Sequence, residues 1–315
     1  MPDLLKAIVL GVVEGVTEFL PISSTGHLVL CERWLGVDLE HDRFWKMFVI
    51  FIQIGAIAAV VVYFRARIAA LLRGRNAPQP TPLEISATVL HSTIGAHTSR
   101  AGEGGLQAAV AEQEAAAAPA APKAPLIFRR NHALWMIIVG SLPLGIAFLA
   151  HRWAESNLES PRIIATALGV GGVLMILIEY FRPATNTPII EEMTWRQALG
   201  VGMAQIVAAL FPGTSRSAAT IMGGELAGLS RAAAAEFSFF LAIPAMSAAC
   251  AFSLLRHQTT LDLRHVLLLA VGTLVSFLVA LVVIAGFMSF IRRHSFVPFA
   301  VYRILLAAVV FYVFR

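Results

Sequence analysis

The sequence predicts an all-α polytopic membrane protein, built from six transmembrane helices and two re-entrant helical hairpins that form an inverted-topology internal repeat. Three observations lead to this fold class. Of the 315 residues, 58% are hydrophobic and only 14% are charged, with a mean hydropathy of +0.76, whereas soluble domains are about a quarter charged. Six apolar stretches are long enough to cross a bilayer. Two further apolar stretches each break in the middle at a proline.

The six long apolar stretches are predicted to be transmembrane helices because a bilayer core requires about 20 apolar residues. They are residues 44–64, 132–150, 163–181, 236–255, 265–291 and 298–314. The two broken stretches, residues 4–35 and 197–230, contain the sequences LPISSTGH and FPGTSRSAAT. Each half of a broken stretch is too short to span the bilayer, so we expect each stretch to enter and leave on the same side.

Residues 75–125 form the one long segment that is poor in large apolar residues and rich in Ala, Pro and Gly. This composition predicts a mostly disordered, low-complexity insertion, with one short helix around residues 105–118. Arginines flank the insertion on both sides, which places it in the cytoplasm by the positive-inside rule. These arginines are Arg65, Arg67, Arg73, Arg75, Arg129 and Arg130.

Counting crossings from the insertion predicts that both termini are external and that the two broken stretches enter from opposite faces. The net charge of +5 comes mostly from arginine, and in a membrane chain arginine reports topology first. We therefore expect no nucleic acid partner.

The opposite entry of the two broken stretches predicts an internal repeat. An offset of 191 aligns Pro21 with Pro212, Glu14 with Gln205 and Ser24 with Ser215, and it carries residues 44–64 onto residues 235–255. The chain 1–315 is then one membrane domain, with residues 1–181 and 197–315 as its two repeats. Because each repeat holds one hairpin and three spans, the second copy inserts upside down.

The proline and glycine breaks predict a polar pocket where the two hairpin tips meet, because irregular backbone at membrane depth needs protein or water around it. The helices that follow the breaks direct their N-termini into this pocket, which favours an anion. Glu14 and Glu18 share one helix face, and Arg216 lies near the same pocket by symmetry. Carboxylates that hold a divalent ion beside an arginine that holds phosphate oxygens suit phosphoryl chemistry.

Two other interpretations of these charges stay open. The two acids can point at water or at Lys6, and the pocket can belong to an anion transporter. The remaining acids lie mostly near span ends, where we expect solvated carboxylates. They are Glu179, Glu191, Glu192, Glu225 and Glu236, of which Glu236 is a candidate to orient the second hairpin.

Four sequences, EGVTEFLPISSTGHL, FPGTSRSAATI, FIQIGA and AEFSFFLAIP, resemble those of the undecaprenyl-pyrophosphate phosphatase family of the bacitracin-resistance type. The resemblance covers nearly the whole chain except residues 75–125, which are longer than the usual loop of the family. It implies a multi-pass hydrolase of the bacterial inner membrane, open to the outer side, that depends on Mg²⁺ or Ca²⁺. Its implied substrate is the long isoprenoid pyrophosphate that is left after cell-wall glycan transfer, and its product is the recycled monophosphate carrier.

The resemblance also implies residue roles. Glu18, with Glu14, positions the metal or activates the nucleophile, Ser24 attacks the terminal phosphorus, and Arg216 holds the pyrophosphate. His27 protonates the leaving oxygen or polarises the nucleophile. The substrate-binding set is Ser23, Thr25, Gly213, Ser215, Arg216, Ser217, Thr220 and Gln53.

Each of these roles has an alternative. Water can attack while Ser24 binds phosphate, His27 can merely cap the second arm of its hairpin, and Gln53 can make an interhelical hydrogen bond. The expected partners are the pyrophosphate lipid and membrane lipids, with a homodimer left open. The alternative function is a flippase that moves the carrier monophosphate between leaflets.

Overall fold

The computed structural model describes residues 1–37, 42–73, 131–149, 160–256 and 262–315. The predicted insertion at residues 75–125 and its predicted short helix lie outside the described residues. The described part is helical apart from its turns and one isolated β-bridge between Thr187 and Leu229. The predicted all-α class is therefore confirmed.

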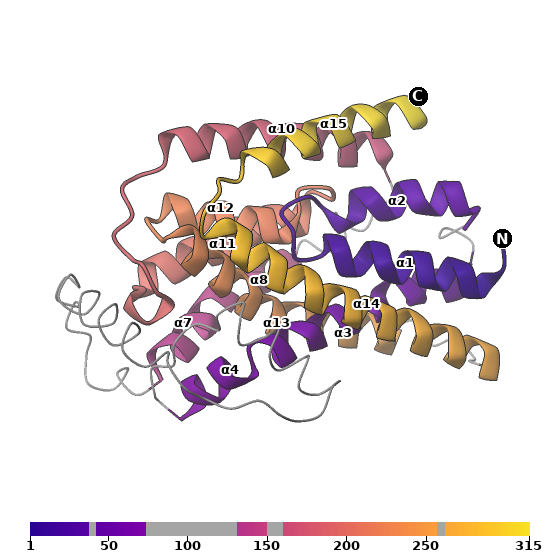
Figure 1. The fold of residues 1–315 in the computed structure, drawn as a ribbon, viewed down its shortest axis with the longest axis horizontal. Coiled ribbons are helices and arrows are strands. Elements are labelled where there is room, and N and C mark those ends of the chain that lie inside the picture. Colours follow the sequence, from indigo (N-terminus) through magenta and orange to yellow (C-terminus); the bar gives the residue numbers. More distant parts are fainter. Residues whose placement is uncertain (38–41, 74–130, 150–159, 257–261) are drawn as a thin grey trace, which may run out of the picture.

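The first broken stretch forms two antiparallel helices, α1 (Asp3–Thr17) and α2 (Ser24–Leu35), which lie beside each other in Figure 1. Gly36 ends α2 in the left-handed conformation at φ 63°, a conformation that glycine adopts without a Cβ penalty. The rest of the first half follows as α3 (Arg43–Tyr63), α4 (Arg65–Leu72), α7 (His132–Ser141), α8 (Leu144–Leu149) and α10 (Pro161–Phe181).

The second half begins with the 3₁₀ turn η2 (Ile190–Glu192) and a second pair of helices, α11 (Trp195–Leu210) and α12 (Arg216–Leu226). A capping box starts α11, since the Thr194 side chain accepts from the backbone N–H of Gln197 and the Gln197 side chain accepts from that of Thr194. The chain then forms α13 (Arg231–Arg256), α14 (Leu263–Ile291) and α15 (Val297–Val313).

Four helices are long and apolar enough to cross a membrane: α3, α10, α13 and α14. They match four of the six predicted spans, which agrees with a polytopic membrane protein. The predicted span 298–314 is the shorter apolar helix α15, of 17 residues. The predicted span 132–150 is divided by a turn at Leu142 and Pro143 into α7 and α8. Proline lacks an N–H and disfavours helical backbone at the residue before it.

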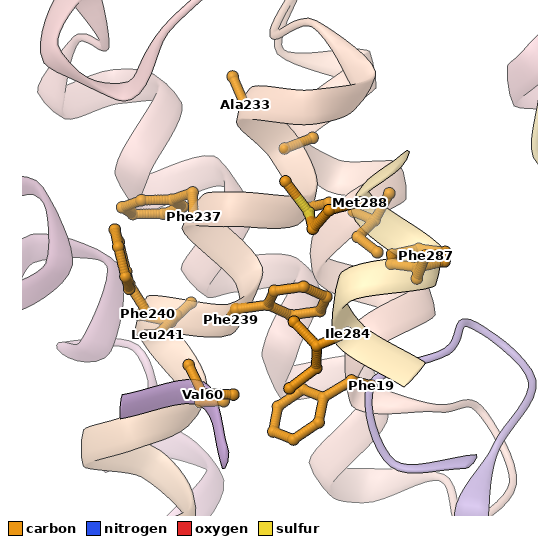
Figure 2. Packing of buried hydrophobic residues seen from close by; sticks show 14 of the residues in the cluster. Phe19, Val60, Ala233, Phe237, Phe239, Phe240, Leu241, Ile284, Phe287 and Met288 are labelled. Atoms are coloured by element: carbon orange, nitrogen blue, oxygen red, sulfur yellow. The ribbon is translucent and has the colours of Figure 1, made fainter. Parts of the chain in front are cut away.

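The largest hydrophobic cluster lies where α13, α14 and the first break meet. Phe19, from the break between α1 and α2, contacts Phe239 edge to face with a centroid distance of 5.2 Å. Figure 2 shows Phe19, Phe239 and Ile284 facing one another, with Phe287 on the neighbouring turn of α14. Since Phe19 is fully buried, the apolar core holds the break at a defined position.

Glycines allow α1 and α11 to approach neighbouring helices at backbone distance. A Cβ added to Gly11 of α1 would lie 2.6 Å from the carbonyl oxygen of Gly272 in α14. A Cβ added to Gly202 of α11 would lie 2.2 Å from the carbonyl oxygen of Gly140 in α7. Figure 1 shows α1 running along α14. Close crossing through small residues is the usual way that helices associate in membranes.

Buried ion pairs link α13 to neighbouring segments. Arg67 of α4 is bound by Glu236 of α13 and by Glu191 at 2.7 Å each. Arg231 of α13 pairs with Glu179 of α10 and Glu225 of α12. The prediction of solvated carboxylates is wrong for Glu225 and Glu236, which are buried and bind arginines contributed by other segments.

We expect Gly202→Ala to lower the melting temperature of the detergent-purified protein, because a methyl group there meets backbone that cannot move aside. Overpacking of this kind costs about 1–3 kcal/mol. The control is Gly200→Ala on the same helix, where no atom lies within 4 Å of the added Cβ. Equal melting temperatures for the two variants would show that the α11–α7 crossing is not tight.

Candidate active site

Both breaks contain a serine with an unusual backbone conformation. Ser23 has φ 74° and Ser215 has φ 71°, and they are the only non-glycine residues with positive φ in the described part of the chain. Each is the N-cap of the helix that follows, accepting a hydrogen bond from the backbone N–H three residues on, that of Gly26 or Ala218. Such conformations are strained and occur preferentially at functional sites. The two breaks thus make the same turn into a helix N-terminus.

The matching serines correct the predicted alignment by one residue after the break. The sequence offset pairs Ser24 with Ser215, whereas the backbone pairs Ser23 with Ser215 and therefore Ser24 with Arg216. One residue separates the proline from the capping serine in the first break, and two residues separate them in the second. A single offset of 191 for the whole repeat cannot account for this extra residue.

The carboxylate of Glu18 joins the two breaks. The Ser24 hydroxyl donates to Oε2 at 2.7 Å, and Nη2 of Arg216 donates to Oε1 at 3.2 Å. Ser24 and Arg216 are the first residues of α2 and α12, so each helix N-terminus contributes one donor. The structure therefore brings together three of the predicted catalytic residues.

Arg216 is held on its other side as well. Its Nη1 donates to the carbonyl oxygen of Ser238 at 3.0 Å, and the guanidinium lies 5.4 Å from the centre of the Phe19 ring. Glu18 and Arg216 have only 9% and 14% of their side chains exposed. An ion pair this poorly hydrated is a strong electrostatic feature of its surroundings.

Glu14 is fully buried one helical turn before Glu18. Neither of its carboxylate oxygens has a hydrogen-bond partner among the described residues, although Glu18 and Arg216 are close enough to interact with it electrostatically. A buried carboxylate without partners is costly, so it indicates a binding place for a proton, a water molecule or a cation.

The carboxylates of Glu14 and Glu18 fit a divalent cation whose other ligands are phosphate oxygens of a substrate and water. The described residues contain no group of three His, Cys, Asp or Glu side chains around a common point. Mg²⁺, however, is usually held by one or two carboxylates together with substrate phosphates and water. The orphaned oxygens of Glu14, beside Glu18, match this donor set.

Most of the predicted phosphate-binding hydroxyls instead fasten the site together. Ser217 donates to the carbonyl oxygen of Leu20 at 2.8 Å and is hydrogen-bonded to Ser215 at 3.0 Å. Thr220 is fully buried and bonds the Ser238 hydroxyl at 2.6 Å. Thr25 is half-buried in the first turn of α2. Ser217 and Thr220 therefore join α12 to the first break and to α13.

His27 is held by both ring nitrogens. Nδ1 lies 2.7 Å from the carbonyl oxygen of Ser23, which only accepts, so Nδ1 carries a proton. Nε2 lies 2.7 Å from the Tyr302 hydroxyl, and the two rings stack with an interplanar angle of 6°. A neutral His27 therefore accepts from Tyr302, a residue of α15 that the sequence analysis missed.

Two more predicted residues and one missed residue complete the site. Gln53 lies beside Cys250, with 3.9 Å between the amide oxygen and Sγ, and Cys250 lies within electrostatic reach of Glu14 and Glu18. Gly213 has φ 90°, and its carbonyl oxygen accepts from Arg303 of α15. An arginine inside the apolar stretch 298–314 was the signal that could have revealed Arg303.

Known proteins are similar in sequence to nearly the whole chain. The sequence profile of the family described as "Bacitracin resistance protein BacA" matches residues 7–309, which include both breaks. The chain belongs to the BacA family. The family expected from the sequence motifs is thereby confirmed.

Three relatives of this BacA-family chain bear the same name. The chain is 39% identical to the undecaprenyl-diphosphatase of Koribacter versatilis, over 97% of this chain and 96% of the relative. It is 40% identical to that of Sorangium cellulosum, over 96% and 84% of the two chains. It is 38% identical to that of Caldanaerobacter subterraneus, over 99% and 96%.

We expect Glu18→Ala and Arg216→Ala each to lower the melting temperature clearly, because each leaves a buried charge unpaired at a cost of roughly 3–5 kcal/mol. The double variant should lose much less than the sum of the two losses, since it removes both charges. The exposed pair Asp3 and Arg264, with Arg264 69% exposed, is the control, and its Arg264→Ala variant should change little. Strictly additive losses at Glu18 and Arg216 would contradict a direct pair.

Proposed function

We propose that this BacA-family chain hydrolyses undecaprenyl pyrophosphate to undecaprenyl phosphate and inorganic phosphate. The observation that carries this conclusion is the meeting of Glu18, Ser24 and Arg216 at two helix N-termini. An acid, a hydroxyl and a guanidinium in one poorly hydrated place are the groups that phosphoryl transfer requires. The names of the full-length relatives support the same reaction on the same lipid.

The pyrophosphate binds between the N-termini of α2 and α12. The Arg216 guanidinium has a planar fork that suits phosphate oxygens, and the first N–H groups of both helices add partial positive charge. Binding of the substrate draws Arg216 partly away from Glu18, which frees the carboxylate to act as a base.

Ser24 is the proposed nucleophile because its hydroxyl already donates to Glu18 at 2.7 Å. Ser24 Oγ forms a bond to the terminal phosphorus, the bond to the bridging oxygen breaks, and the hydroxyl proton passes to Glu18. Undecaprenyl phosphate leaves with the electron pair of that bond. Water then cleaves the phosphoserine and releases phosphate. In the alternative route water attacks directly and Ser24 binds a phosphate oxygen.

We propose that His27 gives a proton to the leaving oxygen, which requires Nε2 first to take up a proton and to exchange its hydrogen bond with the Tyr302 hydroxyl for one with the substrate. Its Nε2 is bound to the hydroxyl of Tyr302, which is 44% exposed, so the phenol connects the ring to the surface. Imidazole suits this task because it exchanges protons near neutral pH.

Glu14 and Glu18 are the residues that would hold Mg²⁺ or Ca²⁺. When bound, the cation neutralises charge on the phosphate oxygens and favours in-line displacement. Glu14 needs such a partner more than Glu18 does, because its oxygens are the ones without hydrogen bonds in the described structure.

The membrane arrangement is also part of the proposal. Six spans cross the bacterial inner membrane, and two re-entrant hairpins each enter it and leave on the same side. The pocket opens to the periplasmic side, and both termini are external. Residues 1–181 and 197–315 form the inverted repeat. The matching serine turns and the paired glycine crossings of α1 and α11 support it, as do the two termini at one end of the molecule in Figure 1.

A flippase for the carrier phosphate is the second candidate and is not favoured. Re-entrant hairpins are common in transporters, but fold-level likeness does not define a function. The relatives are named diphosphatases, and the site holds a hydroxyl hydrogen-bonded to a carboxylate, which transport does not require.

The purified protein in detergent should release phosphate from a long-chain isoprenyl pyrophosphate, and EDTA should abolish the release until Mg²⁺ or Ca²⁺ is added back. Glu18→Gln should lower turnover by about 10²-fold or more, since it removes the base and a ligand. Absence of phosphate release under all metal conditions would exclude the proposed function. An EDTA-insensitive rate would remove the metal but leave the hydrolysis.

Ser24→Ala should lower turnover by about 10³-fold if Ser24 is the nucleophile, while substrate binding stays within about threefold. Ser24→Cys should retain part of the turnover, because a thiolate also attacks phosphorus. Single-turnover phosphate release and lipid binding are measured on both variants. Near-normal turnover in Ser24→Ala assigns the attack to water.

A further inference from the structure

Arg303 is a fully buried arginine in the middle of α15. Within the described part of the chain, no carboxylate lies at ion-pair distance from its guanidinium. A buried charge without a counter-ion costs several kcal/mol. The other deeply buried arginine, Arg67, differs in having two carboxylate partners. Interactions other than an ion pair must therefore compensate for the burial of the Arg303 charge.

Its guanidinium donates to three backbone carbonyls on three separate segments. Nη1 lies 3.4 Å from the oxygen of Pro21, and Nη2 lies 3.3 Å from the oxygens of Gly213 and Ala167. Pro21 is two residues before the capping Ser23, and Gly213 is two residues before the capping Ser215. One side chain thus ties the same point of both breaks to each other and to α10.

The surface of α10 is shaped to receive this side chain. A Cβ added to Gly171 would lie 2.3 Å from Nη2 of Arg303. The second break also rests on α10, since a Cβ added to Gly213 would lie 2.5 Å from the oxygen of Ile164. Two residues earlier on α10, Gly169 differs, because a Cβ there would lie 3.5 Å from the Ala307 methyl group, an ordinary contact.

We propose that Arg303 is a positioning residue for the pyrophosphate site, and this inference rests on the function proposed above. Arg303 touches none of Glu18, Ser24 and Arg216. It acts by holding the two capping turns at a fixed separation, so that Ser24 and Arg216 meet at one carboxylate. Its unneutralised charge adds to the positive potential of the two helix N-termini, and the bound diphosphate supplies the missing counter-charge.

Two substitutions separate the tether from the charge. Arg303→Lys keeps the charge but has no planar fork to reach three carbonyls, so we expect kcat to fall at least about tenfold while KM changes less than about threefold, because a misplacement of about 1 Å is costly for catalysis. Arg303→Met also removes the charge, so KM should rise by about tenfold in addition.

A third substitution tests the same geometry without touching Arg303. Gly171→Ala displaces the guanidinium, and it should reproduce the loss of kcat seen in Arg303→Lys. Gly169→Ala is the matched control on the same helix and should stay within about twofold of the parent chain. Thermal unfolding and gel filtration in detergent accompany every variant, so that kcat is compared only between folded proteins.

The outcomes distinguish this inference from the proposed function. If the parent chain releases no phosphate, the function fails. If it releases phosphate and Gly171→Ala and Arg303→Lys match Gly169→Ala in kcat, the positioning role is excluded. A loss of kcat confined to Gly171→Ala and the Arg303 variants supports it. Should Arg303→Met fail to fold, Gly171→Ala against Gly169→Ala decides the question alone.

Discussion

The hydrogen bonds that Ser24 and Arg216 give to the Glu18 carboxylate are the interaction on which the rest of the structure depends. A carboxylate in an apolar bundle requires donors close by, and the donor Arg216 lies 198 positions along the chain from its acceptor Glu18. The two broken hairpins must therefore meet tip to tip. The strained serine turns, the bond from Ser217 to Leu20 and the edge contact between Phe19 and Phe239 all serve that meeting.

Close packing of the surrounding helices holds this junction in place. Glycine crossings bring α1 onto α14 and α11 onto α7 at backbone distance, so both hairpins are fixed by van der Waals contact along their first arms. The second arms are fixed from the other side by α10 and α15, which pack against each other above the breaks in Figure 1. Close packing fixes the helices, and hydrogen bonds from Ser217, Thr220 and Arg303 fix the breaks between them.

Two sets of buried charges differ in whether each charge has a direct partner. Arg67 forms ion pairs with both Glu191 and Glu236. Near the breaks, no described carboxylate lies at ion-pair distance from Arg303, and no described donor is hydrogen-bonded to the Glu14 carboxylate, although Glu18 and Arg216 lie close to it. Paired buried charges hold segments together, whereas buried charges of both signs without a direct partner suit a site that takes up a cation and a diphosphate together.

The sequence by itself determined the membrane class, the helices, the two breaks and the residues Glu18, Ser24 and Arg216, because hydropathy and short motifs are local properties. It did not reveal the roles of Tyr302 and Arg303, because their partners are distant in the sequence. Tyr302 is hydrogen-bonded to His27, 275 positions away, and Arg303 to Pro21, 282 positions away. Only the tertiary structure decided that Ser23 matches Ser215, that Glu225 and Glu236 are buried, and that Ser217 and Thr220 fasten helices. These facts depend on which backbone atoms come together in space, and no spacing along the chain encodes that directly.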